Sequence, residues 1–163
     1  MAKRSLLLTA RCLTTEIIEY CRHLPLNIIF DKTICVHGFP PDSPIVYLSE
    51  TTEPELIWTF RNMDKEICFL GHTHLLEIIE YDGENISRHR PQSGTVELAV
   101  GKQYLINVGS VGQPRDSNKN AKYVIWDDSQ RLLEIRFVPY DNHVTIRKIM
   151  DLGWPEAHAR RLR

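Results

Sequence analysis

Two short apolar runs that end in histidine constrain the fold of this chain most strongly. Residues 33–36 (TICV) lead into His-Gly at 37–38, and residues 67–70 (ICFL) lead into Gly-His-Thr-His at 71–74. Apolar runs of this length, bounded by glycine, are typical of buried strands. Residues 54–60 between them begin with proline and predict a helix. A strand–helix–strand unit places its two strands side by side and parallel, with both carboxyl ends at one edge of the sheet.

Three histidines follow these two strands and are the candidate metal ligands. His37 and His72 are 35 positions apart (72 − 37), and His74 follows two residues later. Ligand sites in such sheets lie beyond the carboxyl ends of the strands, and imidazole is the commonest protein ligand for transition metals. In a continuing strand, positions i and i+2 point the same way, so His72 and His74 are expected to share a target. The alternative is that all three are ordinary loop or packed histidines.

The remainder of the chain predicts an α/β fold, α+β by count, in one domain over 1–163. After His74 the apolar residues alternate with polar ones, as in half-buried strands. Helical spacing appears near both ends, at 9–23 and over 144–152 and 155–162. Six further strands are predicted, in a largely antiparallel C-terminal sheet: 75–81, 86–90, 95–100, 104–108, 122–126 and 132–138. The other four histidines (His23, His89, His143 and His158) are expected at the surface.

Composition limits the partners of the chain. Of its 163 residues, 42% are apolar and 25% charged, which is ordinary for a globular domain, and the net charge is −1. A charge this close to zero does not favour nucleic acid as a main partner. No apolar run approaches the ~20 residues that span a bilayer, and the apolar block near Leu6 is too short for a secretory signal. We therefore expect a cytoplasmic protein with no membrane partner.

A second polar segment, residues 107–116 (NVGSVGQPRD), follows another predicted strand. Backbone amides in a glycine-rich turn can bind anions, and an arginine offers a bidentate donor to a phosphate oxygen. Ser110 and Arg115 are therefore the candidate substrate-binding residues. The alternative is a tight corner of the sheet that carries a solvated arginine.

The motifs His-Gly at 37–38, Gly-His-Thr-His at 71–74 and the segment 107–115 resemble the calcineurin-like metallophosphoesterases. The likeness is to the small bacterial and archaeal branch of phosphodiesterases and diadenosine-tetraphosphatase relatives, and it extends from about residue 9 to about 140. It implies part of a four-layer αββα sandwich. It also implies two divalent metal ions (Mn, Fe, Zn, Ni or Mg) bridged by a carboxylate, and a bound hydroxide that attacks phosphorus. By this resemblance His37 and His72 would bind one ion and His74 the other, and the substrate would be a phosphate ester, possibly a nucleotide.

Three family elements are missing from this sequence. The family carries Asp-x-His, Gly-Asp and Gly-Asn-His-Asp before the His-Gly element, and here no glycine is followed by Asp or Asn. Asp141-Asn142-His143 spells Asp-x-His but lies after every other motif. The chain therefore resembles the C-terminal two-thirds of a member, without the metal-binding N-terminal third and its acid/base histidine. We expect apolar surface or an unpaired edge to be exposed at strands 33–36 and 67–70.

The sequence leaves three functions open. The first is a metal-dependent phosphoesterase in truncated or split form, with an incomplete dinuclear site, because three neutral imidazoles cannot bridge two hard cations without a carboxylate. A complementing N-terminal half or a homo-oligomer would be its partner. The alternative is a non-catalytic protein-interaction scaffold on the same fold. The third is a single-metal binding domain that uses only the three histidines.

Overall fold

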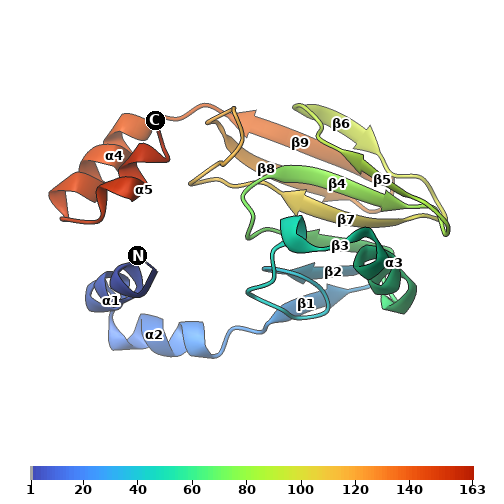
Figure 1. The fold of residues 1–163 in the computed structure, drawn as a ribbon, viewed down its shortest axis with the longest axis horizontal. Helices are drawn as coiled ribbons and strands as arrows, with labels where there is room; N and C mark the ends of the chain where they lie inside the picture. Colours follow the sequence, from blue (N-terminus) through green and yellow to red (C-terminus); the bar gives the residue numbers. More distant parts are fainter. Residues whose placement is uncertain (1) are drawn as a thin grey trace. The chain divides into compact units, whose positions relative to one another are not determined.

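The computed structural model describes residues 2–163, which form two compact units. Residues 26–139 make one unit and contain all the strands that the structure describes. The segments up to residue 25 and 140–163 make the other, which is helical (Figure 1). A single domain over 1–163 stays a prediction.

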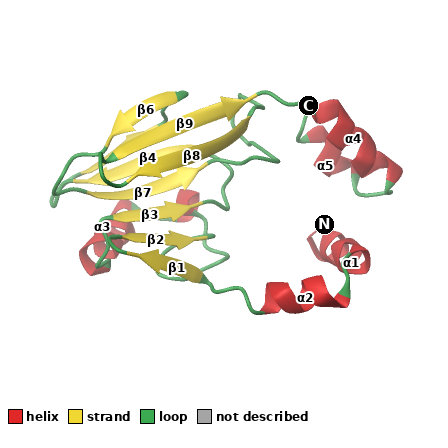
Figure 2. Ribbon diagram, turned by 180° about the vertical axis from the view of Figure 1, so that it is seen from behind, coloured by secondary structure: helices red, strands yellow, loops and turns green. Residues whose placement is uncertain are grey.

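The strands of unit 26–139 form two sheets (Figure 2). The larger has six strands, in the order β1 (Asn27–Phe30), β2 (Thr33–Val36), β3 (Ile67–Leu70), β7 (Gln103–Val108), β4 (Leu76–Tyr81) and β5 (Ile86–His89). The smaller has three, in the order β6 (Gly94–Glu97), β9 (Leu132–Val138) and β8 (Ala121–Asp127). This mixed architecture confirms the expected α+β fold class.

The predicted strand–helix–strand unit is confirmed. β2 and β3 pair in parallel, with Ile34 opposite Cys68, and β3 pairs in parallel with β7. Helix α3 (Glu53–Asn62) lies between β2 and β3 in the chain, after a single 3-10 turn, η1 (Leu48–Glu50). A capping box fixes its start, because the Glu55 side chain accepts a hydrogen bond from the Thr52 backbone N–H at 2.7 Å. The carboxyl ends of β2, β3 and β7 therefore meet at one edge of the sheet.

The central strands of the six-stranded sheet are covered on both faces. Successive side chains in a strand point to opposite faces, so Cys68 and Leu70 face one core and Ile67 faces the other. The first core includes Leu56 and Phe60 of α3, and the second includes Leu133 and Ile135 of β9. Helix, large sheet and small sheet thus form three successive layers within this unit.

The strands after His74 pair antiparallel with one another, as predicted, but they do not run as a meander in sequence order. β7 lies between β3 and β4, and β6, β8 and β9 leave to form the smaller sheet. The reason lies in burial, because β7 is buried on both faces, with Tyr104 on one core and Leu105 on the other. A strand buried on both sides suits a central, partly parallel position.

The expected exposure of strands 33–36 and 67–70 is wrong in its location. Ile34, Val36, Ile67 and Leu70 are all buried. The uncovered apolar surface lies instead on the edge strand β1, where Ile28, Ile29 and Phe30 are 58%, 55% and 48% exposed. β1 pairs with β2 on one side only, so it takes the edge position that the sequence had suggested for β2.

In the second unit, the described residues 2–25 and 140–163 form four helices. They are α1 (Ala2–Cys12), α2 (Thr15–Arg22), α4 (Asn142–Asp151) and α5 (Glu156–Arg160). The single helix predicted over 9–23 is wrong, because Thr14 caps a new helix by accepting a hydrogen bond from the Ile17 N–H at 3.3 Å. A small core of Ile146, Ala159 and Leu162 lies between α4 and α5. Among residues 2–163, no helix is both long and apolar enough to cross a membrane.

Candidate functional site

His37 and His72 meet at the carboxyl ends of β2 and β3. Nε2 of His37 lies 3.0 Å from Nδ1 of His72, within hydrogen-bond distance. The two rings stand edge to face, with centroids 4.9 Å apart and planes at 68°. The backbone joins the same two loops, because the Gly71 N–H donates to the His37 carbonyl at 3.0 Å. Two of the three predicted ligands are thus brought together.

The backbone at His72 and His74 departs from the continuing strand expected from the sequence. β3 ends at Leu70, and both histidines have positive φ angles of 61°. The rule that i and i+2 share a direction therefore does not apply here, and a shared target of His72 and His74 stays a prediction. Left-handed backbone at a residue other than glycine costs roughly 1–3 kcal/mol and is concentrated at functional sites. Two such residues flank Thr73 in a tight bend.

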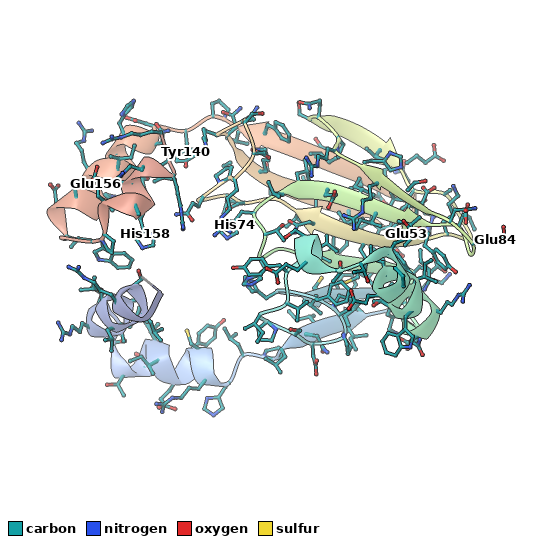
Figure 3. The ribbon with its side chains drawn as sticks, in the orientation of Figure 1. Glu53, His74, Glu84, Tyr140, Glu156 and His158 are labelled. Carbon is teal, nitrogen blue, oxygen red and sulfur yellow. The ribbon has the colours of Figure 1, made fainter. Side chains whose placement is uncertain are left out.

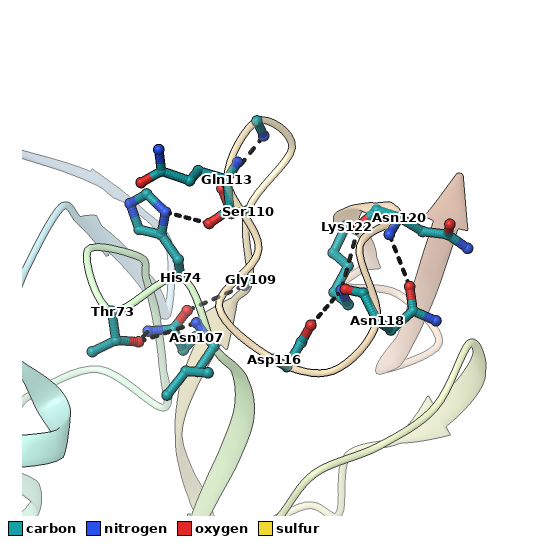
Figure 4. A network of polar contacts seen from close by, with 12 residues as sticks. Thr73, His74, Asn107, Gly109, Ser110, Gln113, Asp116, Asn118, Asn120 and Lys122 are labelled. Carbon is teal, nitrogen blue, oxygen red and sulfur yellow. Dashed lines mark hydrogen bonds and ion pairs between the residues drawn. The ribbon is translucent and has the colours of Figure 1, made fainter. Parts of the chain in front are cut away.

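Asn107 holds this bend in place. Its side chain is fully buried at the end of β7, and its amide donates to the Gly71 carbonyl at 2.6 Å and to Thr73 Oγ1 at 2.7 Å. Its Oδ1 accepts a hydrogen bond from the Gly109 N–H at 3.1 Å (Figure 4). Two bonds from this buried side chain therefore tie the bend that carries the two histidines to the neighbouring strand β7.

Tyr47, which contacts His72, was not identified from the sequence, and Gly38 was recognised only as part of the His-Gly motif. The ring of Tyr47 stacks on His72 with centroids 4.0 Å apart and an angle of 28° between the planes. Gly38 permits the loop that carries Tyr47 to return, because a Cβ at this position would lie 2.5 Å from the Ser43 carbonyl oxygen. The available signals were the glycine directly after His37 and the single aromatic ring late in the following loop.

His74 forms a hydrogen bond of its own, to the loop after β7. Its Nδ1 lies 2.8 Å from the Gln113 carbonyl oxygen, so this nitrogen carries the proton and Nε2 is free of it (Figures 3 and 4). The Arg115 N–H donates to the His74 carbonyl at 3.1 Å. Metal-binding histidines commonly donate their second ring N–H to a carbonyl in this manner.

The protonation of His37 also suits a ligand. Partial burial of its ring, and secondarily the neighbouring His72, hold the pKa of His37 below its usual value. At neutral pH its imidazole is therefore neutral, which is the form that binds a metal.

The donor set fits part of a metal site and does not complete one. Two nitrogens that each lie about 2.1 Å from one ion, at an angle near 90°, are roughly 3 Å apart, which matches the His37–His72 spacing. Within residues 2–163, however, no group of three or more His, Cys, Asp or Glu side chains is arranged to hold an ion. No carboxylate of these residues joins His37 and His72 in such a group, so the charge of two divalent cations would not be balanced.

Ser110 and Arg115 both lie on the loop after β7, but only the Ser110 side chain forms hydrogen bonds within that loop. Ser110 Oγ accepts hydrogen bonds from the backbone N–H groups of Gly112, at 3.4 Å, and Gln113, at 2.9 Å. These two amides of the glycine-rich turn are therefore directed at a side chain of their own loop. Arg115 is exposed, and among the described residues its guanidinium has no hydrogen bond or ion pair.

Of the remaining histidines, His23, His89 and His143 are exposed as predicted. His158 differs, because it is half-buried on α5 and its Nε2 lies 2.8 Å from the Ser5 hydroxyl. Within unit 26–139, His89 does not join His37 and His72 in a group of ligands.

Three comparisons place the chain among known proteins. An uncharacterized protein of Methanocaldococcus jannaschii is 33% identical over 162 residues, a match that covers 97% of this chain and 63% of that protein. A metallophosphoesterase from Sphaerobacter thermophilus superposes with a TM-score of 0.81 at 29% identity, covering 93% of this chain and 62% of that one. A hypothetical protein from Pyrococcus horikoshii superposes with a TM-score of 0.64 at 16% identity, over 88% and 52% of the two chains. No protein-family model matches.

These similarities give the chain a metallophosphoesterase-like fold, and they support the superfamily that its motifs resemble. The chain spans 63% of the Methanocaldococcus protein and 62% of the Sphaerobacter metallophosphoesterase, less than two-thirds of either.

Proposed function

We propose that this chain provides part of the active site of a metal-dependent phosphoesterase that hydrolyses a phosphodiester or phosphomonoester. The observation that carries the proposal is the approach of His37 Nε2 to His72 Nδ1, at 3.0 Å, across the ends of two parallel strands. The likeness to the Sphaerobacter metallophosphoesterase, together with the Gly-His-x-His motif, supplies the chemical class.

In this proposal the chain's own residues hold and orient a divalent ion. His37 and His72 would each donate one nitrogen to the same ion. The stacked ring of Tyr47 would fix the ring of His72, and Asn107 would fix the backbone on either side of His72. His74 would offer Nε2 to a second ion, while Gln113 accepts its Nδ1 proton. A bound divalent ion lowers the pKa of a water molecule and stabilises the negative charge that develops at phosphorus.

The site requires carboxylate ligands from outside the described residues. We propose that additional polypeptide supplies them, as the family's N-terminal elements do. Two observations support this: the longer chains of the two relatives, and the uncovered apolar side chains of β1. β1 lies beside β2, with Asn27 opposite Val36, so its uncovered edge is one strand away from the strand that carries His37.

Reconstitution tests this proposal. The chain is mixed with the portion of the Methanocaldococcus relative that it does not match, and hydrolysis of bis-p-nitrophenyl phosphate is measured with added Mn²⁺. The chain alone is expected to be near background, and the mixture to turn over the substrate. Replacing His72 by Ala is expected to abolish the gain, and replacing the exposed His143 by Ala is expected to leave it unchanged.

Two results would contradict the proposal. Turnover by the chain alone that is lost on His72→Ala would show that its own residues complete the site. A mixture that forms a stable complex yet shows no His72-dependent hydrolysis would exclude the enzymatic role. That second result would favour the alternative, a non-catalytic scaffold that binds partners through the apolar edge at Ile28, Ile29 and Phe30.

A further inference from the structure

A polar cavity of about 330 Å³ begins directly after His74. Leu75, Arg90 and Pro91 line one part of it, and Arg115, Lys122 and Phe137 line another. Two lining residues connect the cavity to His74. Leu75 is the next residue in the chain, and the Arg115 N–H donates a hydrogen bond to the His74 carbonyl at 3.1 Å. The size is within the range of cavities that bind small molecules.

The charges that face this cavity leave a positive excess. Lys122 is only 1% exposed, and its Nζ pairs with the Asp116 carboxylate at 2.8 Å, so these two charges compensate each other (Figure 4). Arg90 approaches Glu77 only loosely, at 3.8 Å, with 76% of its side chain exposed. Arg115 has no side-chain partner among the described residues. Two guanidinium groups therefore remain available to a bound anion.

Lys122 also fixes the loop that presents Arg115. Its Nζ donates to the carbonyls of Asn118, at 2.5 Å, and Asn120, at 3.3 Å, and lies 4.9 Å from the centre of the Phe137 ring. Its backbone N–H donates to the Ser110 carbonyl at 3.0 Å. The buried lysine thus holds both ends of segment 110–120, and Arg115 lies in the middle of that segment.

The wall of the cavity is not purely polar. Leu75, Pro91 and Phe137 contribute apolar surface next to the two arginines. A ligand that combines a phosphate with an organic group would satisfy both kinds of surface, whereas a free inorganic ion would use only the charged part.

We propose that this cavity binds an organic phosphate, with the phosphate at Arg115 and Arg90 and the organic group against Leu75, Pro91 and Phe137. The proposal that the cavity binds an organic phosphate depends only on the cavity and its charges. The proposal that this ligand is part of the substrate also rests on the proposed phosphoesterase function. In that case the cavity favours substrates that carry a phosphorylated organic group beside the phosphate that is cleaved.

Calorimetric titration of the full chain tests the cavity without any metal. Adenosine monophosphate, adenosine and inorganic phosphate are titrated separately in the presence of a chelator and at low salt. AMP is expected to bind at least about tenfold more tightly than either of the others, because only AMP engages both the arginines and the apolar wall. Arg115→Gln is expected to weaken AMP binding about tenfold or more. Arg147→Gln, which removes an exposed arginine from α4, is the matched control and should change nothing.

Several outcomes would overturn the proposal. Equal binding of AMP and adenosine would exclude a role for the arginines, and equal binding of AMP and inorganic phosphate would exclude the organic group. Unchanged AMP affinity in Arg115→Gln, with the variant folded by circular dichroism, would place the ligand elsewhere. Because these titrations exclude metal, they are independent of metal binding at His37 and His72, and either proposal can fail without the other.

Discussion

The side-chain amide of Asn107 donates a hydrogen bond to the hydroxyl of Thr73 over 2.7 Å, although the two residues are 34 positions apart. Both side chains are buried. Thr73 lies between the two left-handed histidines, and Asn107 ends the neighbouring strand β7. The geometry of His72 and His74 therefore depends on a residue far away in the sequence.

Replacing Asn107 by Ala is expected to destabilise the fold by about 2–4 kcal/mol. The change removes two donated bonds and one accepted bond, and it leaves the half-buried Gly71 carbonyl without its 2.6 Å partner. Urea unfolding measures the loss. Asn62→Ala is the control, because Asn62 is exposed and donates one bond to the Trp58 carbonyl, worth about 1 kcal/mol or less. Similar losses in the two variants would show that Asn107 does not hold the bend.

Replacing Lys122 by Met is expected to cost about 3–5 kcal/mol, because it leaves Asp116 without its buried partner. The double variant Lys122→Met with Asp116→Asn should recover part of this loss, since the unpaired charge is removed as well. Lys32→Met is the control, because the Lys32 side chain is 60% exposed, and solvent screening leaves its pair with Glu66 little effect on stability. Equal losses for Lys122→Met and the double variant would contradict the assigned charge pairing.

The pH dependence of stability should include a contribution from Glu66. Its hydrogen bond to Lys32, aided by a second one to Arg131, holds the pKa of this carboxyl below its usual 4.5. A depressed pKa in the folded state contributes stability above the unfolded pKa, and this is lost as the pH falls through the folded value. Glu66→Gln should therefore be less stable than wild type at pH 7, and the gap should close below pH 4.5. A gap that is constant with pH, or equal to that of exposed Glu97→Gln, would contradict this.

The edge strand β1 should make the isolated chain self-associate. Ile28, Ile29 and Phe30 expose apolar side chains on an unpaired edge, and such edges pair with other strands. Ile29→Lys is expected to lower the sedimentation coefficient at high protein concentration, whereas Val144→Lys on α4 should have no effect. A wild-type chain that stays monomeric at all concentrations would show that this edge is not adhesive.

Local patterns in the sequence were sufficient for most strands and for the central strand–helix–strand unit. The apolar runs at 33–36 and 67–70, and the proline-led helix between them, are short-range signals whose meaning does not depend on distant residues. The position of β7 was not predictable in this way. Its pairing with β3 depends on the packing of Tyr104 and Leu105 on two different cores. The periodicity of apolar residues does not show which distant strands pack together.

The site was predicted in part, for similar reasons. The meeting of His37 and His72 follows from parallel strand ends, which the sequence indicated. The separate bonding of His74 was not predictable, because it depends on a bend held by Asn107 and on a carbonyl of Gln113. Tyr47 was missed because stacking on His72 requires the loop after Gly38 to fold back. Ser110 was assigned to substrate from its place in a glycine-rich segment, and its hydroxyl accepts bonds from its own turn.

Calorimetric titration of the chain with Mn²⁺ and with Zn²⁺ tests most directly whether His37 and His72 bind the same ion. One ion is expected at this pair, and His37→Ala and His72→Ala should each weaken its binding by at least about tenfold. The double variant should lose less than the sum of the two single losses, because both changes remove ligands of the same ion, and exposed His143→Ala should match wild type. Unchanged affinity in His37→Ala and His72→Ala, or no ion bound by the wild-type chain at millimolar metal, would contradict a shared metal site.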